Sequence, residues 1–164
     1  DKIHMYDVKI SKNQSYQESK TYESGQSAKI AKLKVNGKYY KIGLTICYDL
    51  RFPHLFRDLA LNGADLITVP SVFMHITGKD HWHSLLKARA IETGCYIVAP
   101  AQYGHYFNKR KSYGHSLIVS PWGKILKDAK TEKNIIITDI DKRQIEIARS
   151  KIPSLFINKK YKIN

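Results

Sequence analysis

The stretch GLTICYDLRFP, residues 43–53, is the most informative part of the sequence and carries its best candidate for a nucleophile. An apolar run ends here at Ile46, and Pro53, which suits the first turn of a helix, follows soon afterwards. Cys47 therefore lies at a strand-to-helix turn, where free backbone N–H groups point toward any nearby anion. The turn is expected to lower the pKa of the thiol and to supply a nucleophile and an oxyanion donor together. Spacing alone also allows Cys47 to be a small core residue.

Strand and helix patterns extend outward from this stretch. Residues 30–35 alternate between apolar and polar side chains and are followed by an Asn-Gly pair at 36–37. This pair predicts a hairpin whose second strand, residues 38–46, leads directly into the cysteine. Residues 52–61 have helical spacing and end at a second Asn-Gly pair, residues 62–63, which is typical of a helix C-cap.

Short apolar strands alternate with helices in the rest of the chain. The predicted strands cover residues 64–69, 95–101, 116–119 and 135–140, and the predicted helices cover residues 80–93 and 141–149. Asp80 is the candidate N-cap of the first of these helices, and Gly94 is its stop. The polar residues 11–28 are expected to form a surface excursion rather than a core element. The alternation favours an α/β layer architecture in one domain, residues 1–164.

Composition sets further limits. The chain has 164 residues, 43% of them hydrophobic, which is enough for one globular domain with a core. No stretch approaches the roughly 20 apolar residues that span a bilayer, and the N-terminus has no signal-peptide pattern, so a cytoplasmic protein without membrane contact is expected. The two cysteines make neither a disulfide framework nor a zinc site, and Cys95 is expected in the core. The cysteines therefore give no indication of a metal site.

The formal net charge of +14 raises the question of nucleic-acid binding. The lysines are spread widely, however, with small clusters at residues 29–41, 109–111 and 159–162. The sequence contains no recognised nucleic-acid module and no element in which aromatic and basic residues interleave. A solvated basic surface is therefore favoured, and no nucleic-acid partner is expected.

Several motifs resemble, in the same order, those of the nitrilase (carbon–nitrogen hydrolase) superfamily. Residues 43–53 resemble its nucleophile motif, and residues 80–93 resemble the helix that follows. SYGHS at 112–116 and SPWG at 120–123 are similar to two later signatures, and residues 152–153 fit the tail motif. The resemblance covers essentially the whole chain. It is greatest to the Nit branch, which includes deaminated-glutathione amidase and omega-amidase.

The resemblance implies roles for individual residues. Cys47 matches the nucleophile, and the backbone N–H of Tyr48 is implied as an oxyanion donor. Lys2 looks like the catalytic lysine that helps to hold the oxyanion, and Glu18 resembles a supporting glutamate. Apart from the resemblance, three residues just after a strand end are candidates for contacting a substrate, with ordinary loop packing as the alternative: Phe73, Thr77 and His81.

The same resemblance implies that residues 1–164 are the C-terminal portion of a four-layer αββα sandwich. The family's general-base glutamate precedes its lysine, on a stretch that this chain does not contain, and the first strands are missing with it. The implied reaction is hydrolysis of a non-peptide C–N bond in a small, dicarboxylate-like amide, through a thioester on Cys47. The resemblance implies that this reaction needs no metal and no organic cofactor. Without the base we expect little or no activity from the chain alone. The family also implies a homodimer, or pairing with the upstream half of the domain.

In the alternative that stays open, the chain is a catalytically dead fragment or a subunit that binds a partner. The absent glutamate favours this interpretation, while the presence of Cys47, Lys2 and Glu18 weighs against it.

Overall fold

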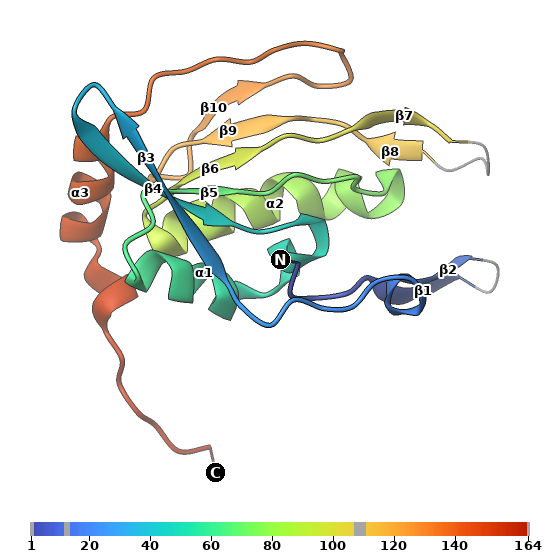
Figure 1. The fold of residues 1–164 in the computed structure, drawn as a ribbon, viewed down its shortest axis with the longest axis horizontal. Coiled ribbons are helices and arrows are strands. Elements are labelled where there is room, and N and C mark those ends of the chain that lie inside the picture. Colours follow the sequence, from blue (N-terminus) through green and yellow to red (C-terminus); the bar gives the residue numbers. More distant parts are fainter. Residues whose placement is uncertain (1, 12–13, 107–110, 164) are drawn as a thin grey trace.

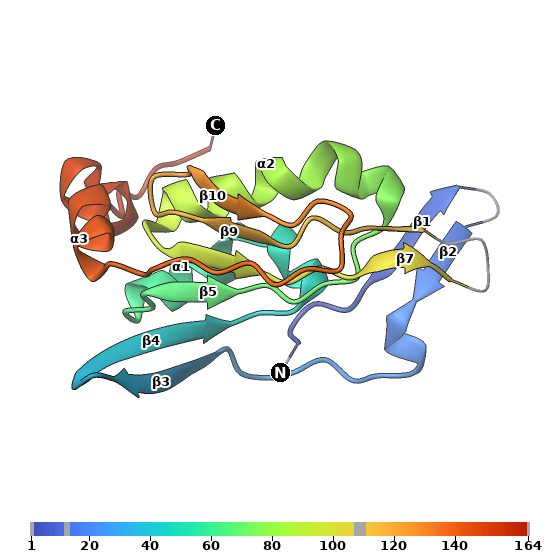
Figure 2. The same cartoon turned by 90° about the horizontal axis from the view of Figure 1, so that it is seen from above.

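A six-stranded mixed sheet forms the centre of the molecule, which a computed structural model describes over residues 2–11, 14–106 and 111–163 (Figure 1). In spatial order its strands are β10 (Ile125–Asp128), β9 (Leu117–Val119), β6 (Tyr96–Ala99), β5 (Leu66–Thr68), β4 (Lys38–Leu44) and β3 (Lys29–Val35). Two hairpins lie outside this sheet: β1 (Asp7–Ser11) with β2 (Gln14–Gln17), and β7 (Tyr103–His105) with β8 (Lys111–Tyr113). Figure 2 shows both hairpins at the same end of the sheet.

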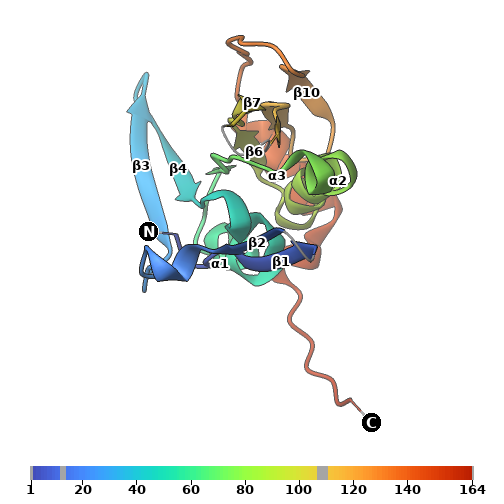
Figure 3. The same ribbon diagram turned by 90° about the vertical axis from the view of Figure 1, so that its right-hand side faces the viewer.

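Helices cover one face of this sheet. The helices α1 (Pro53–Leu61) and α2 (His75–Thr93) lie on the same side of it (Figure 3), and α3 (Lys142–Lys151) lies at the end opposite the hairpins. Three short 3-10 helices complete the fold: η1 (Glu18–Lys20), η2 (Cys47–Arg51) and η3 (Pro153–Phe156). Among the described residues, no helix is both long and apolar enough to cross a membrane.

The core lies between the sheet and the two helices. Strands β4, β5 and β6 run parallel, and α1 and α2 form the crossovers between them. Four buried residues form one row across this face of the sheet in paired register: Gly43, Ile67, Ile97 and Val119. A Cβ at Gly43 would lie 3.2 Å from Cδ1 of Leu59 on α1, so glycine lets the helix approach the sheet closely. The predicted α/β layering is therefore present.

The hairpin and the first helix form where the sequence predicts them. Val35 pairs with Lys38, so the predicted Asn-Gly pair makes a two-residue turn. Both turn residues have positive φ, 48° at Asn36 and 77° at Gly37, as a tight turn of this type requires. Pro53 occupies the first turn of α1. The chain therefore runs from β4 into the turn at Cys47, and α1 follows shortly afterwards.

The second helix begins earlier than predicted. It starts at His75, and Asp80 lies exposed inside it, so the prediction of an N-cap at Asp80 is wrong. The first turn contains Gly78 and β-branched side chains, which are weak helix formers. Packing of this turn against β8 stabilises it, a tertiary contact that no local pattern reveals. The predicted stop is confirmed, because Gly94 is the C-cap with φ 61°.

The predicted strand over residues 135–140 is not formed. This segment is extended but has no strand partner among the described residues, and it runs back to α3 outside the sheet (Figure 1). Ile135 and Ile137 are 83% and 76% exposed. Alternation of apolar residues predicts an extended chain, but a strand also requires a neighbour that supplies hydrogen bonds.

The polar segment over residues 11–28 is ordered in part. Its described residues stay outside the core, as predicted, but they contribute β2 and the 3-10 helix η1, which carries Glu18. Residues 12–13 lie outside the described part of the chain. The segment therefore positions a candidate site residue rather than serving only as a surface excursion.

Replacing Gly78 by alanine is expected to destabilise the protein by about 1–3 kcal/mol, the usual range for overpacking. An added methyl group would lie 2.5 Å from both Cβ and Cγ of Tyr113, and a Cβ cannot rotate away. Helix propensity alone would make alanine about 1 kcal/mol more favourable than glycine here. The sign of the change in the free energy of unfolding therefore shows whether overpacking or helix propensity is the larger effect. Thermal denaturation measures it. The exposed neighbour Lys79→Ala serves as the control, and a stabilised Gly78→Ala variant would contradict the close contact.

Candidate active site

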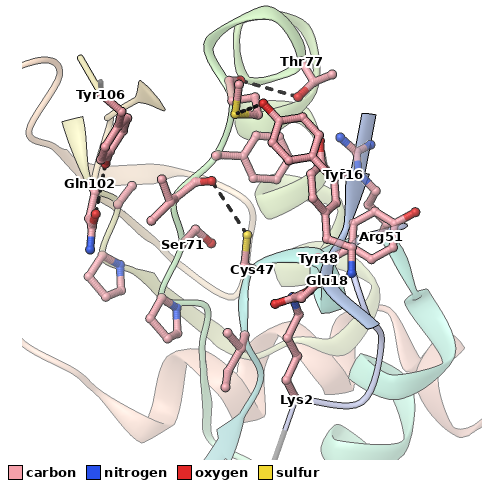
Figure 4. A pocket seen from close by; sticks show the side chains of 18 of the residues that line it. Lys2, Tyr16, Glu18, Cys47, Tyr48, Arg51, Ser71, Thr77, Gln102 and Tyr106 are labelled. Carbon is pink, nitrogen blue, oxygen red and sulfur yellow. Dashed lines mark hydrogen bonds and ion pairs between the residues drawn. The ribbon is translucent and has the colours of Figure 1, made fainter. Parts of the chain in front are cut away.

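A cavity of about 1150 Å³ opens at the carboxyl ends of the parallel strands (Figure 4). Residues just beyond each strand line it, including Cys47 after β4, Ser71 after β5 and Ala101 after β6. Lys2 and Glu18 line it from the N-terminal segment and η1. In open α/β sheets, ligands bind in the crevice outside the carboxyl ends of the strands. The topology thus brings the predicted residues to the place where a ligand is expected.

Cys47 has an unusual backbone conformation. Its φ is 50°, in the left-handed region that residues with a side chain seldom adopt. The N–H of Cys47 donates a hydrogen bond of 2.9 Å to the carbonyl of Pro70, which ties the turn to the end of β5. The Sγ atom faces the cavity, 4.0 Å from the carbonyl oxygen of Val72 (Figure 4). Strained conformations of this kind persist where the surroundings enforce them, and they cluster at active sites.

The carboxylate of Asp49 holds this turn against the N-terminal segment. It is fully buried and accepts hydrogen bonds from the backbone N–H of Ile46, at 2.9 Å, and of His4, also at 2.9 Å. The His4 ring nitrogen Nδ1 lies 2.8 Å from the same carboxylate, and the ring stacks on Phe52 at 3.5 Å. Two segments 45 residues apart are therefore joined at one buried charge.

Lys2 and Glu18 form an ion pair on the cavity wall. The Lys2 ammonium donates to Glu18 Oε2, and the same oxygen accepts a hydrogen bond of 2.6 Å from the backbone N–H of Tyr6. Both side chains are mostly buried, with 13% of Lys2 and 26% of Glu18 exposed. Because Glu18 is fixed by the backbone, it orients the lysine. Figure 4 shows the pair beside Cys47.

Burial raises the pKa of the Cys47 thiol above its ordinary value, so the prediction that the turn lowers this pKa is wrong. The Lys2 ammonium acts against burial and lowers the pKa, while the Glu18 carboxylate raises it. The local turn geometry does not decide the direction, because desolvation of the thiolate is the largest effect. A group that takes the proton, or added positive charge, is needed to produce the reactive thiolate.

Aromatic rings and a guanidinium complete the cavity. The ring of Tyr6 lies 5.0 Å from that of Tyr48 and 5.3 Å from that of Tyr16. Arg51 also lines the cavity, and its guanidinium lies 5.2 Å from the ring centroid of Phe73. Arg51 lies within residues 43–53, but its position in the sequence gives no indication that its side chain reaches the cavity. The wall thus combines apolar area with one additional cation.

The structure brings most of the predicted residues together. Six of them line the cavity: Lys2, Glu18, Cys47, Tyr48, Phe73 and Thr77. His81 is exposed on α2 and is not among the lining residues, although its Nδ1 lies 3.3 Å from the guanidinium of Arg51. The prediction that His81 contacts a substrate directly therefore has no geometric support. The roles expected for the other six residues stay predictions. The structure adds three residues to which the sequence analysis gave no role: Asp49, His4 and Arg51.

Asp49→Asn is expected to destabilise the fold by about 1–3 kcal/mol, because an amide cannot accept from all the donors that now face the buried carboxylate. The loss should also change the reactivity of Cys47 toward iodoacetamide, since the turn loses its tie to His4. Urea denaturation and alkylation rates measure the two effects. Asp58→Asn, an exposed carboxylate on α1, is the matched control and should change stability by less than about 0.5 kcal/mol. Equal behaviour of the two variants would show that Asp49 is dispensable.

Residues 1–150 match the model of the family described as carbon-nitrogen hydrolase. Two curated proteins named deaminated glutathione amidase are similar to the chain. The one from Dictyostelium discoideum is 46% identical over 167 residues, which is 99% of this chain and 56% of that protein. The one from Synechocystis sp. strain PCC 6803 is 43% identical over 154 residues, which is 94% of this chain and 56% of that protein. The chain thus spans about half the length of these relatives.

The fold is similar to that of a solved structure, the NitFhit protein of C. elegans. The TM-score is 0.84 at 36% sequence identity, and the match covers 96% of this chain and 38% of that protein. The predicted α/β fold is confirmed by this likeness.

Proposed function

The chain belongs to the carbon–nitrogen hydrolase family, and on this premise we propose that it forms the nucleophile-bearing part of an amidase that hydrolyses a non-peptide C–N bond in a small amide. The observation that carries the proposal is the position of Cys47. Its left-handed turn lies at the carboxyl ends of three parallel strands, in the same cavity as the Lys2–Glu18 pair. Covalent hydrolysis requires a nucleophile beside a group that holds the oxyanion, and this cavity contains candidates for both.

The proposed reaction has two steps. A general base takes the proton of the Cys47 thiol, and the thiolate attacks the amide carbonyl carbon. The oxyanion that forms is held by the Lys2 ammonium and by the backbone N–H of Tyr48 in the first turn of η2, where helical N–H groups have no acceptor within the helix. The C–N bond breaks, ammonia leaves with the proton returned by the base, and a thioester remains. Water, deprotonated by the same base, then releases the acid and the free thiol.

We infer that the general base lies outside the described residues. Glu18 is the one carboxylate lining the cavity among the described residues, and it already accepts from Lys2 and from the N–H of Tyr6. These two donors already occupy the Oε2 atom of Glu18. The relatives are nearly twice as long, and we place the base in the portion of their domain that has no counterpart in these 164 residues. General acid–base catalysis contributes about 10²–10⁴-fold, so we expect the chain alone to be a poor enzyme.

We propose that the substrate is a monoamide of a dicarboxylic acid. Arg51 is a cation on the cavity wall apart from Lys2, and a guanidinium binds carboxylates with two parallel hydrogen bonds. The curated relatives are named for amidase activity on deaminated glutathione, which is a further reason to consider acidic amides. The apolar ring of Phe73 under the guanidinium would limit its hydration and strengthen such a contact.

Arg51→Gln is expected to raise KM for a dicarboxylate monoamide by about 10- to 100-fold, the effect of losing a hydrogen bond to a charged group. The KM for an uncharged amide of the same length should hardly change, so the uncharged amide serves as the control substrate. Steady-state ammonia release from both substrates measures the effect. An equal rise in KM for the two amides would show that Arg51 supports the cavity wall without binding a carboxylate.

A partner-binding role without catalysis is the second candidate. Leu44, at the end of β4, is 39% exposed, and the extended segment over residues 135–140 exposes Ile135 and Ile137 to 83% and 76%. Exposed apolar side chains beside an unpaired segment favour contact with another strand or chain. The rest of the domain and a second copy of this chain are the two candidates for that contact.

The test compares this chain with a completed domain, in which the upstream half of the Dictyostelium relative is joined to it. Cys47 alkylation by iodoacetamide is followed against pH for both proteins, and ammonia release is followed with dicarboxylate monoamides. We expect hydrolysis by the completed domain and an acyl-enzyme on Cys47 that mass spectrometry detects. A completed domain that folds but neither hydrolyses an amide nor acylates Cys47 would overturn the amidase proposal in favour of the partner-binding role.

A further inference from the structure

A cluster of metal-ligating side chains lies outside the cavity. His83 belongs to α2, His115 precedes β9, and Asp128 ends β10. Asp128 Oδ2 lies 3.3 Å from Nε2 of His83 and 3.1 Å from Nδ1 of His115. One donor atom from each of the three residues lies within 4.8 Å of the other two. None of the three lines the cavity around Cys47, so the proposed amidase function makes no use of the cluster.

We propose that these three side chains bind a divalent transition-metal ion, with Zn²⁺ as the best candidate. Two imidazoles and one carboxylate suit Zn²⁺, Co²⁺ or Ni²⁺ and are a poor match for the all-oxygen preference of Mg²⁺ and Ca²⁺. Ligand atoms at 2.0–2.2 Å from a tetrahedral ion are separated by about 3.4 Å. The observed separations between the carboxylate and the two rings are close to that value, so an ion can enter with small side-chain rotations.

The backbone around the cluster is fixed. His115 has φ 58°, its N–H donates to the carbonyl of Lys130 at 2.6 Å, and its own carbonyl accepts from Nε1 of the buried Trp82 at 2.8 Å. The Lys130 N–H donates to Oδ1 of Asp128 at 2.7 Å, which leaves Oδ2 directed at the rings. Contacts of this kind orient metal ligands and raise affinity. Contacts with the backbone and with Trp82 therefore help to hold His115 and Asp128 in place without an ion.

A second group orients His83. The hydroxyl of Tyr113 lies 3.5 Å from Nδ1 of His83, and its ring stacks on that of His115 at 4.3 Å. If Nδ1 carries the proton and faces the hydroxyl, the lone pair of Nε2 is available to an ion. The three ligand side chains are 20–29% exposed, which gives an ion access from solvent and allows a water molecule as the fourth ligand. The ion would join α2 to the β9–β10 edge of the sheet.

The competing interpretation is a hydrogen-bonded contact in which Asp128 accepts from both rings without an ion. Its distances are the same, so binding must be measured. The experiment titrates Co²⁺ and then Zn²⁺ into the Cys47→Ser variant, which removes the cavity thiol as a possible ligand. Visible absorption reports on tetrahedral Co²⁺, and calorimetry gives the stoichiometry and affinity for Zn²⁺.

We expect one ion per chain, no thiolate-to-cobalt charge-transfer band, and a rise in Tm with Zn²⁺. His83→Gln, His115→Gln and Asp128→Asn should each weaken binding by at least about tenfold. His105→Gln, a histidine on β7 outside the cluster, is the matched control and should bind normally. His83 lies at the surface of α2, so its variant tests the site even where Asp128→Asn fails to fold. Binding that is absent, or unchanged in His83→Gln, or that shows a thiolate band, would overturn the proposal.

Discussion

Replacing Cys47 by serine is expected to abolish amide hydrolysis by the completed domain, lowering kcat/KM on the order of 10⁶-fold, as when the nucleophile of a covalent hydrolase is removed. A serine hydroxyl is far less acidic than a thiol, and no base positioned for Cys47 compensates for that difference. The variant should also fail to form the acyl-enzyme that mass spectrometry detects with the unchanged protein. Ammonia release and intact mass therefore measure the same loss independently.

Cys95→Ala provides the matched control for this result. Cys95 is fully buried, and its Sγ lies 3.2 Å from the carbonyl of Ala64 and 3.1 Å from the guanidinium of Arg149. That guanidinium keeps its bonds to the carbonyls of Ala64 and Thr93 without the thiol. We expect Cys95→Ala to retain hydrolysis and one iodoacetamide-reactive thiol. If hydrolysis survives in Cys47→Ser, or is lost only in Cys95→Ala, then Cys47 is not the nucleophile.

The parts of the fold that the sequence predicts are those that neighbouring residues determine. An Asn-Gly pair can take up two positive φ angles by itself, and a proline in a first turn starts α1 without help from distant residues. These two local signals frame the turn at Cys47. The position of the nucleophile could therefore be predicted before any packing was known.

The features that the sequence does not predict depend on partners distant in the chain. The first turn of α2 forms because Gly78 packs on Tyr113, 35 residues later, although its own residues are weak helix formers. The segment over residues 135–140 has the alternation of a strand but no neighbour, among the described residues, with which to pair. In the first case a tertiary contact outweighs the local preference. In the second case the local preference forms no strand because no partner strand lies beside it among the described residues.

The candidate site divides in the same way. Lys2 and Glu18 could be predicted only through motifs that resemble a known family, because nothing in their own surroundings in the sequence indicates a cavity. Asp49 lies two residues after Cys47, yet its function as a buried tie depends on His4, 45 residues earlier. The direction of the thiol pKa was predicted wrongly because burial is a property of the whole fold.

Lys2→Gln is expected to raise the pKa of the Cys47 thiol further and to lower kcat of the completed domain by about 10²–10³-fold, the range for loss of an oxyanion donor. The ammonium lowers this pKa, so its removal leaves less thiolate at any pH below the pKa, and the alkylation profile moves to higher pH. Glu18→Gln removes a charge that raises the pKa, so its profile should move to lower pH. Loosening of the fold relieves burial and lowers the pKa, so it cannot explain an upward shift in Lys2→Gln. Thermal denaturation separates loosening from the charge effect in Glu18→Gln, and a downward shift in Lys2→Gln would show that Lys2 does not act on the thiol.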